Sequence, residues 1–125
     1  MERTSARILI VDDEPALLKM MGAYLARLGY SVETSASTEE AWTKVRDDPS
    51  GFAVAVLDGS MPGMSSAELA RKILGANPDL RVIAASGYPA DLTEIQAAAP
   101  GRAAFLQKPF APEMLAAMVE RMLAP

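Results

Sequence analysis

The chain has 125 residues, half of them hydrophobic, and its 16 acidic and 12 basic side chains give a formal net charge of −4. This length fits one domain with a substantial core, and the acidic balance argues against a nucleic-acid-binding surface. Cysteine and histidine are both absent, which excludes disulfides, thiolate or imidazole metal sites and histidine acid–base catalysis. No apolar run is as long as a membrane span, and the polar start MERTSAR lacks a signal-peptide core. We therefore expect a cytoplasmic protein.

Short apolar runs alternate with helical patterns in the first half of the chain. The first run, Ile8–Val11, leads into a stripe of leucines and methionine with helical spacing, which Gly29 is expected to end. Residues 30–36, YSVETSA, alternate apolar and polar side chains, a pattern typical of a strand at a sheet edge. STEE at 37–40 has the form of a capping box, which predicts the start of a second helix.

The second half continues the same alternation. Apolar runs at Ala53–Leu57, Val82–Ala85 and Ala103–Leu106 predict three further strands, the first two buried on both faces of a sheet. Helices are expected after each strand: one from SSAE at 65–68, a short alanine-rich one from Asp91 to about Ala98, and one from Pro112. Five such strand–helix units predict an α/β fold, a doubly wound, five-stranded parallel sheet, in a single domain spanning 1–125.

Polar residues stand where the predicted strands end. Asp12 and Asp13 follow the first strand, Asp58 the third and Ser86 the fourth, and Lys108 lies just beyond the fifth. Ligands of open α/β sheets bind outside the carboxyl ends of the strands, near the point where the strand order reverses. If the order is 2-1-3-4-5, the three aspartates converge there, with Ser86 and Lys108 on the same rim.

Three converging carboxylates need a cation. Oxygen ligands without histidine or cysteine favour a hard ion, and Mg²⁺ is the expected one. Lys108 and Ser86 can supply an ammonium group and a hydroxyl donor to a phosphate held by that ion. Taken singly, each residue also has an ordinary structural interpretation: a helix cap for either leading aspartate, turn chemistry for Ser86, a surface charge for Lys108.

The segments VDDEP, LDGSMPGM, ASGY and LQKPF, in this order, resemble the CheY-like receiver domain of two-component response regulators. The resemblance covers about residues 6–123. Within the family, the sequence is most similar to the receivers of hybrid sensor kinases. It implies a flavodoxin-like (βα)5 fold and a phosphoacceptor at Asp58. It also implies that Asp13 and Asp58 bind Mg²⁺ directly, that Asp12 acts largely through water, and that the backbone carbonyl of Ser60 completes the protein ligands.

The resemblance assigns further roles around the phosphoryl group. Lys108 would pair with it and Ser86 would donate a hydrogen bond to it. Phe105 would occupy an aromatic switch position. The Lys108–Pro109 peptide bond would be cis. The expected partners are a histidine kinase or histidine phosphotransfer protein, and a downstream protein that binds the face made by the fourth helix, fifth strand and fifth helix, with no nucleic acid or membrane partner.

The loop after the third strand departs from the family pattern at two positions. Gly59 follows the acceptor where an apolar residue is usual, and Ser66 replaces a common glycine. Gly59 is expected to loosen the loop, and Ser66 to help cap the third helix. Ser60 and Tyr88 each lie two residues after a site residue, so we expect them to tune the lifetime of the acyl phosphate.

Other functions remain as alternatives. An aspartyl-phosphate phosphohydrolase would also use an aspartate nucleophile, a lysine and Mg²⁺, but Ser60 stands where a general acid is needed. A nucleotide-binding domain would need a glycine-rich turn where DDEPA stands. The third alternative is a receiver-like interaction module that is not regulated by phosphorylation. The main prediction is a phosphoacceptor signalling module rather than an enzyme.

Overall fold

The computed structural model describes residues 6–59, 61–87, 93, 95–97 and 100–124. The described residues form one five-stranded, all-parallel sheet in the order β2-β1-β3-β4-β5. Both the fold class and the strand order predicted from the sequence are confirmed. The strands are β1 (Arg7–Val11), β2 (Ser31–Ser35), β3 (Val54–Asp58), β4 (Arg81–Ser86) and β5 (Ala103–Gln107).

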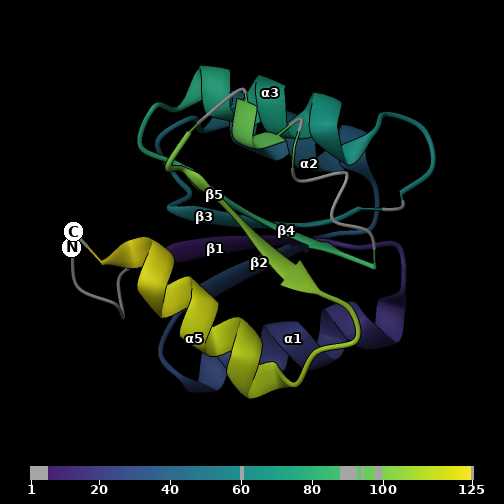
Figure 1. The fold of residues 1–125 in the computed structure, drawn as a ribbon, viewed down its shortest axis with the longest axis vertical. Helices are drawn as coiled ribbons and strands as arrows, with labels where there is room; N and C mark the ends of the chain where they lie inside the picture. The colour runs from purple at the N-terminus through teal and green to yellow at the C-terminus, as the bar shows by residue number, and fades with distance from the viewer. Residues whose placement is uncertain (1–5, 60, 88–92, 94, 98–99, 125) are drawn as a thin grey trace.

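Helices cover both faces of this sheet. Figure 1 shows α1 and α5 below it and α2 and α3 above it. Residues 93 and 95–97 are also helical, within the predicted fourth helix, whose other residues lie partly outside the described ranges. The helices with defined bounds are α1 (Pro15–Arg27), α2 (Thr38–Asp47), α3 (Ser66–Ala76) and α5 (Pro112–Leu123).

The alternation of side chains along the inner strands builds the core. Ile8 and Ile10 of β1 pack with α1 and α5 on one face, whereas Leu9 and Val11 pack with α2 and α3 on the other. Every residue of β3 is buried, as expected for a central strand with helices on both sides. Because the inner strands are fixed on both faces, their carboxyl ends form a rigid platform.

Local signals set where the helices begin and end. Ser37 accepts a hydrogen bond from the Glu40 amide at 3.1 Å, and Ser65 accepts one from the Glu68 amide at 3.1 Å, so both predicted capping boxes start helices. Gly29, with a positive φ of 103°, follows the end of α1. Among the described residues no helix is both long and apolar enough to span a membrane.

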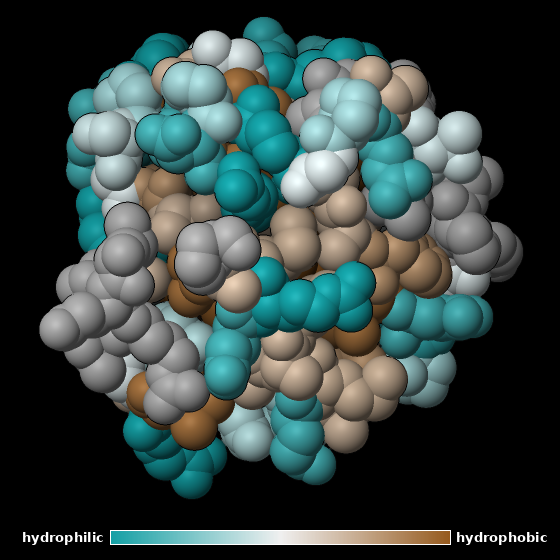
Figure 2. All heavy atoms as spheres, turned by 60° about the vertical axis from the view of Figure 1, so that its left-hand side comes forward, coloured by the Kyte–Doolittle hydropathy of each residue, from teal (hydrophilic) through white to brown (hydrophobic). Residues whose placement is uncertain are grey.

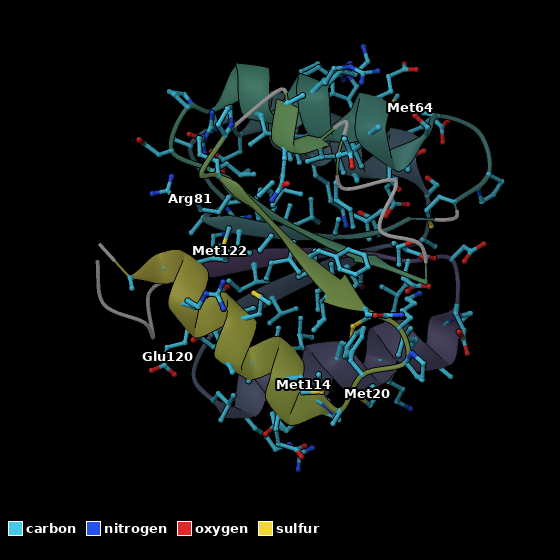
Figure 3. All side chains as sticks on the ribbon, viewed as in Figure 1. Met20, Met64, Arg81, Met114, Glu120 and Met122 are labelled. Carbon is cyan, nitrogen blue, oxygen red and sulfur yellow. The ribbon has the colours of Figure 1, made fainter. Side chains whose placement is uncertain are left out.

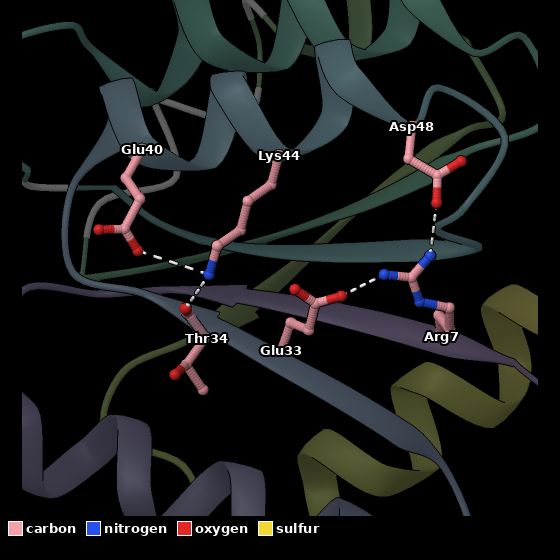
Figure 4. A network of polar contacts seen from close by, with 6 residues as sticks. All are labelled: Arg7, Glu33, Thr34, Glu40, Lys44 and Asp48. Carbon is pink, nitrogen blue, oxygen red and sulfur yellow. Dashed lines mark hydrogen bonds and ion pairs between the residues drawn. The ribbon is translucent and has the colours of Figure 1, made fainter.

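Charged side chains anchor the edge strand β2 to β1 and α2 (Figure 4). Arg7 pairs with Glu33 of β2 and, at 2.8 Å, with Asp48 after α2, and its guanidinium lies 4.5 Å from the centre of the Phe52 ring. Lys44 donates to the carbonyl oxygen of Thr34 at 2.6 Å. Exposed ion pairs of this kind contribute about 1 kcal/mol or less each, and we assign this cluster a structural role.

Candidate functional site

The predicted polar residues meet at the carboxyl ends of the inner strands. Asp58 is the last residue of β3 and Ser86 the last of β4, while Asp12 and Asp13 follow β1 directly. The Asp12 amide donates to the carbonyl oxygen of Ser35 at 3.1 Å, which continues the sheet pairing past the end of β1. The aspartates are therefore placed by the strands themselves.

One carboxylate oxygen from each of Asp12, Asp13 and Asp58 lies within 4.8 Å of the other two. Asp12 and Asp58 are almost fully buried, with 2% and 4% of their surface exposed, whereas Asp13 is exposed. Buried like charges at this separation repel each other and are costly to desolvate. The cluster therefore needs a neutralising cation, and three carboxylates at this spacing could hold a metal ion.

Lys108 supplies positive charge from the loop after β5. Its ammonium nitrogen donates to Asp58 Oδ1 at 3.0 Å and to Asp12 Oδ2 at 3.2 Å. Burial alone would lower the pKa of Lys108, but the hydrogen bonds to Asp58 and Asp12 outweigh it and raise that pKa. Lys108 therefore bridges the two buried carboxylates as a cation.

Asp12 is the most constrained of the three acids. Its Oδ1 accepts from the Glu14 amide at 2.9 Å, while its Oδ2 accepts from Lys108. Burial raises the pKa of Asp12; the Glu14 hydrogen bond opposes the rise, and the nearby Asp58 charge adds to it. Asp13 makes no side-chain hydrogen bond or ion pair with any residue in the described ranges, so its oxygens face solvent.

Other predicted residues lie around the rim of this cluster. The Lys108 amide donates to the carbonyl oxygen of Ser86 at 2.9 Å, which joins the β4 and β5 ends. The Lys108–Pro109 peptide bond is cis, as predicted. Phe105 lies in the middle of β5 opposite Ala84 and is partly exposed. The predicted tuning residues Ser60 and Tyr88 lie outside the described residues.

Ser66 differs from its predicted role. Ser65, not Ser66, caps α3, and the Ser66 hydroxyl donates instead to the backbone carbonyl of Asp58. The capping-box spacing to Glu68 already favoured Ser65. The bond to Asp58 has no local sequence signal, because it forms between residues eight positions apart that the fold brings together.

A groove beside Lys108 was not predicted from the sequence. It has a volume of about 380 Å³ and is lined by Glu14, Leu17, Lys108, Pro109 and Phe110. Leu17 of α1 packs against the core and is partly buried where it lines this groove. The strand-end cluster therefore opens beside a partly apolar surface.

Comparison with known proteins identifies the class. A family model described as the response regulator receiver domain matches residues 8–120. The sequence is 33% identical to the transcriptional regulator NtrC of Azospirillum brasilense over 96% of this chain, and 30% identical to the receiver protein CpdR of Brucella abortus over 94% of it. The chain spans 24% of the NtrC length and 96% of the CpdR length.

Solved structures of receiver domains have the same fold as this chain. A CheY-like receiver domain from Methanospirillum hungatei superposes with a TM-score of 0.85 at 29% identity, covering 94% of this chain and 92% of that one. The receiver domain of the hybrid histidine kinase CckA superposes with a TM-score of 0.82 at 28% identity, covering 95% and 100% of the two chains. The chain belongs to the receiver-domain family of two-component response regulators, a family of phosphoacceptor signalling domains.

Proposed function

We propose that Asp58 accepts a phosphoryl group from a phosphohistidine on a partner histidine kinase or histidine phosphotransfer protein. The observation that carries this assignment is the Lys108 bridge: one ammonium group contacts both Asp58 and Asp12 beside a third carboxylate, at the end of the central strand. The receiver-domain resemblance points to Asp58 as the nucleophile, and its place at the end of β3, between the two acids after β1 and the Ser86 end of β4, supports that role.

The transfer conserves atoms and charge without a further reactant. A carboxylate oxygen of Asp58 attacks phosphorus in line with the bond to the donor imidazole. The new phosphorus–oxygen bond forms as the phosphorus–nitrogen bond breaks, and the nitrogen keeps the electron pair and takes a proton from solvent. Lys108 stabilises charge on the phosphoryl oxygens. The groove lined by Leu17 and Phe110 leaves space beside Lys108, where a side chain of the donor could lie.

Mg²⁺ is the proposed cofactor. The donor set consists of carboxylates, which suits a hard ion, and Asp12, Asp13 and Asp58 would hold it together with the Ser60 backbone carbonyl expected from the resemblance. When bound, the ion neutralises the cluster and draws charge from phosphoryl oxygens. Asp13, with its oxygens toward solvent, would bind it directly, and Asp12 largely through water.

Phosphodonor treatment tests the assignment. With a small phosphodonor and Mg²⁺, intact mass should increase by one phosphoryl group, and peptide mapping should place it on Asp58. Removal of Mg²⁺ with EDTA should abolish the increase, because Lys108 alone leaves the acidic cluster with net negative charge that repels the donor. Equal labelling in EDTA, or a label on another residue, would contradict the proposal.

The proposed output is a changed protein-binding surface. A phosphoryl group on Asp58 adds charge and acceptor oxygens, toward which Ser86 would move, and Phe105 would rotate inward behind it. The affected face comprises the fourth helix, β5 and α5, where β5 is an edge strand with partly exposed apolar residues. Figure 2 shows apolar residues across the middle of the face that it draws, with hydrophilic residues lying over and around them. A cytoplasmic location and a single domain over 1–125 belong to the same proposal.

A phosphoryl mimic tests this coupling. Beryllofluoride with Mg²⁺ should shift NMR resonances across residues 86–110, because the free domain already samples the active form and phosphorylation changes its population. Phe105→Ala should weaken the dependence of partner affinity on phosphorylation. Shifts confined to the Asp58 loop, or an undiminished response in Phe105→Ala, would refute the coupling while leaving the acceptor assignment standing.

A further inference from the structure

The loop from Asp58 to Ser66 connects the proposed acceptor to α3, and glycines stand at positions 59 and 63. Gly59 follows Asp58 directly, and Gly63 has a φ of 80°, a conformation that other residues rarely adopt. The Gly59 amide donates to the carbonyl oxygen of Ala85 at 2.9 Å. This bond holds the amide side of the peptide group between Asp58 and Gly59, and the carbonyl oxygen of Asp58 forms the other side of that group.

Ser66 provides such a contact at the base of the loop. Its hydroxyl donates to the carbonyl oxygen of Asp58, and both residues are buried, with 5% and 4% of their surface exposed. Water therefore competes little for this hydrogen bond. It joins the first residue of α3 to the last residue of β3 and closes the loop at its base.

The far end of the loop is held by α2. The Thr38 hydroxyl donates to the carbonyl oxygen of Met64 at 2.9 Å, and the Met64 amide donates to Glu39 Oε2 at 3.0 Å. This second hydrogen bond lowers the pKa of Glu39. Figure 3 labels Met64 beside the start of α3. These two bonds hold Met64, just before the start of α3, against α2.

We propose that Ser66 is a positioning residue for the acceptor: its hydroxyl fixes the peptide plane after Asp58 and thereby directs the Asp58 carboxylate toward Lys108 and the acidic cluster. The proposal rests on the phosphoacceptor role of Asp58. A glycine at position 66, common in the family, has no hydroxyl to make this bond. The side-chain bond thus offsets the freedom that Gly59 introduces in this chain.

Ser66→Ala tests the inference, with Ser65→Ala as the matched control. Both changes remove a serine hydroxyl at the start of α3, but only the first removes the bond to Asp58. We expect Ser66→Ala to weaken Mg²⁺ binding, measured by calorimetry, about tenfold, the scale of losing a group that orients a metal ligand. Ser65→Ala should bind Mg²⁺ as the parent does. Amide exchange at Gly59 should accelerate in Ser66→Ala alone.

Two further variants keep the test decisive. Ser66→Gly, the residue common in the family at this position, also removes the hydroxyl and provides a second test if Ser66→Ala folds poorly. Ser66→Thr, which retains a hydroxyl, should restore much of the Mg²⁺ affinity. If Ser66→Ala and Ser66→Gly both bind Mg²⁺ like Ser65→Ala, Ser66 acts only on stability and the inference is wrong. If the parent chain binds Mg²⁺ but takes no phosphoryl group, the proposed function fails instead, and the Mg²⁺ affinities still decide whether Ser66 orients Asp58.

Discussion

Replacing Asp58 with asparagine is expected to abolish phosphoryl uptake completely. An amide is too weak a nucleophile to attack phosphorus, so no acyl phosphate forms. The change keeps the size and planar shape of the side chain, and it removes one of three clustered negative charges. Lys108 can still pair with Asp12, which it contacts at 3.2 Å. The variant should therefore fold as the parent does while failing to label.

Asp79→Asn is the matched control for this experiment. Asp79 is exposed in the turn before β4, at the opposite end of the sheet from the acidic cluster. It should label as fully as the parent in intact-mass measurements with a small phosphodonor, and both variants should give the circular dichroism spectrum of the parent. Labelling of Asp58→Asn at the parental level would show that another residue is the acceptor.

The fold was predictable because its signals are local. Strands such as Val54–Asp58 are buried on both faces and therefore appear as uninterrupted apolar runs. Helix starts were set by serine caps and prolines that act within one turn, as at Ser37 and Pro112. Parallel topology then places every strand end on one edge, so the convergence of Asp12 and Asp58 followed from the strand order alone.

Contacts between distant side chains were not predictable in the same way. Both Ser65 and Ser66 have capping chemistry, and only the backbone path decides that Ser66 reaches the Asp58 carbonyl. Likewise, Glu39 holds the Met64 amide although the capping-box pattern singled out Glu40. Such bonds depend on how α2 and α3 pack against each other. The residue pattern within either helix does not determine that packing.

The position of Lys108 is an intermediate case. A lone lysine after a strand is ordinarily a solvated surface charge. Its place in the order of motifs indicated the site, and the structure brings it to Asp12, 96 positions earlier in the sequence. The bridge itself is a tertiary feature: it forms because β5 lies beside β4 and the two buried carboxylates need a cation.

Asp13→Ala is expected to weaken Mg²⁺ binding more than Asp12→Ala does. Asp13 is exposed, and its oxygens are not engaged by any described residue, so they are available to an ion. The two oxygens of Asp12 already accept from the Glu14 amide and from Lys108. Removing a unit charge about 4 Å from a cation costs on the order of 1–4 kcal/mol per unit of cation charge near a protein surface. We therefore expect Asp13→Ala to lower the affinity at least ~10-fold.

Asp12→Ala should have the smaller effect, because it removes a carboxylate whose charge Lys108 already offsets and leaves Lys108 free to pair with Asp58 at 3.0 Å. Calorimetric titration of both variants with Mg²⁺ gives the comparison. Asp13→Asn and Asp12→Asn, which keep side-chain size, separate the loss of charge from the loss of packing at the buried Asp12. A larger loss of affinity in the Asp12 variants would make Asp12 the direct ligand and reverse the two assignments, with the fold and the acceptor assignment unaffected.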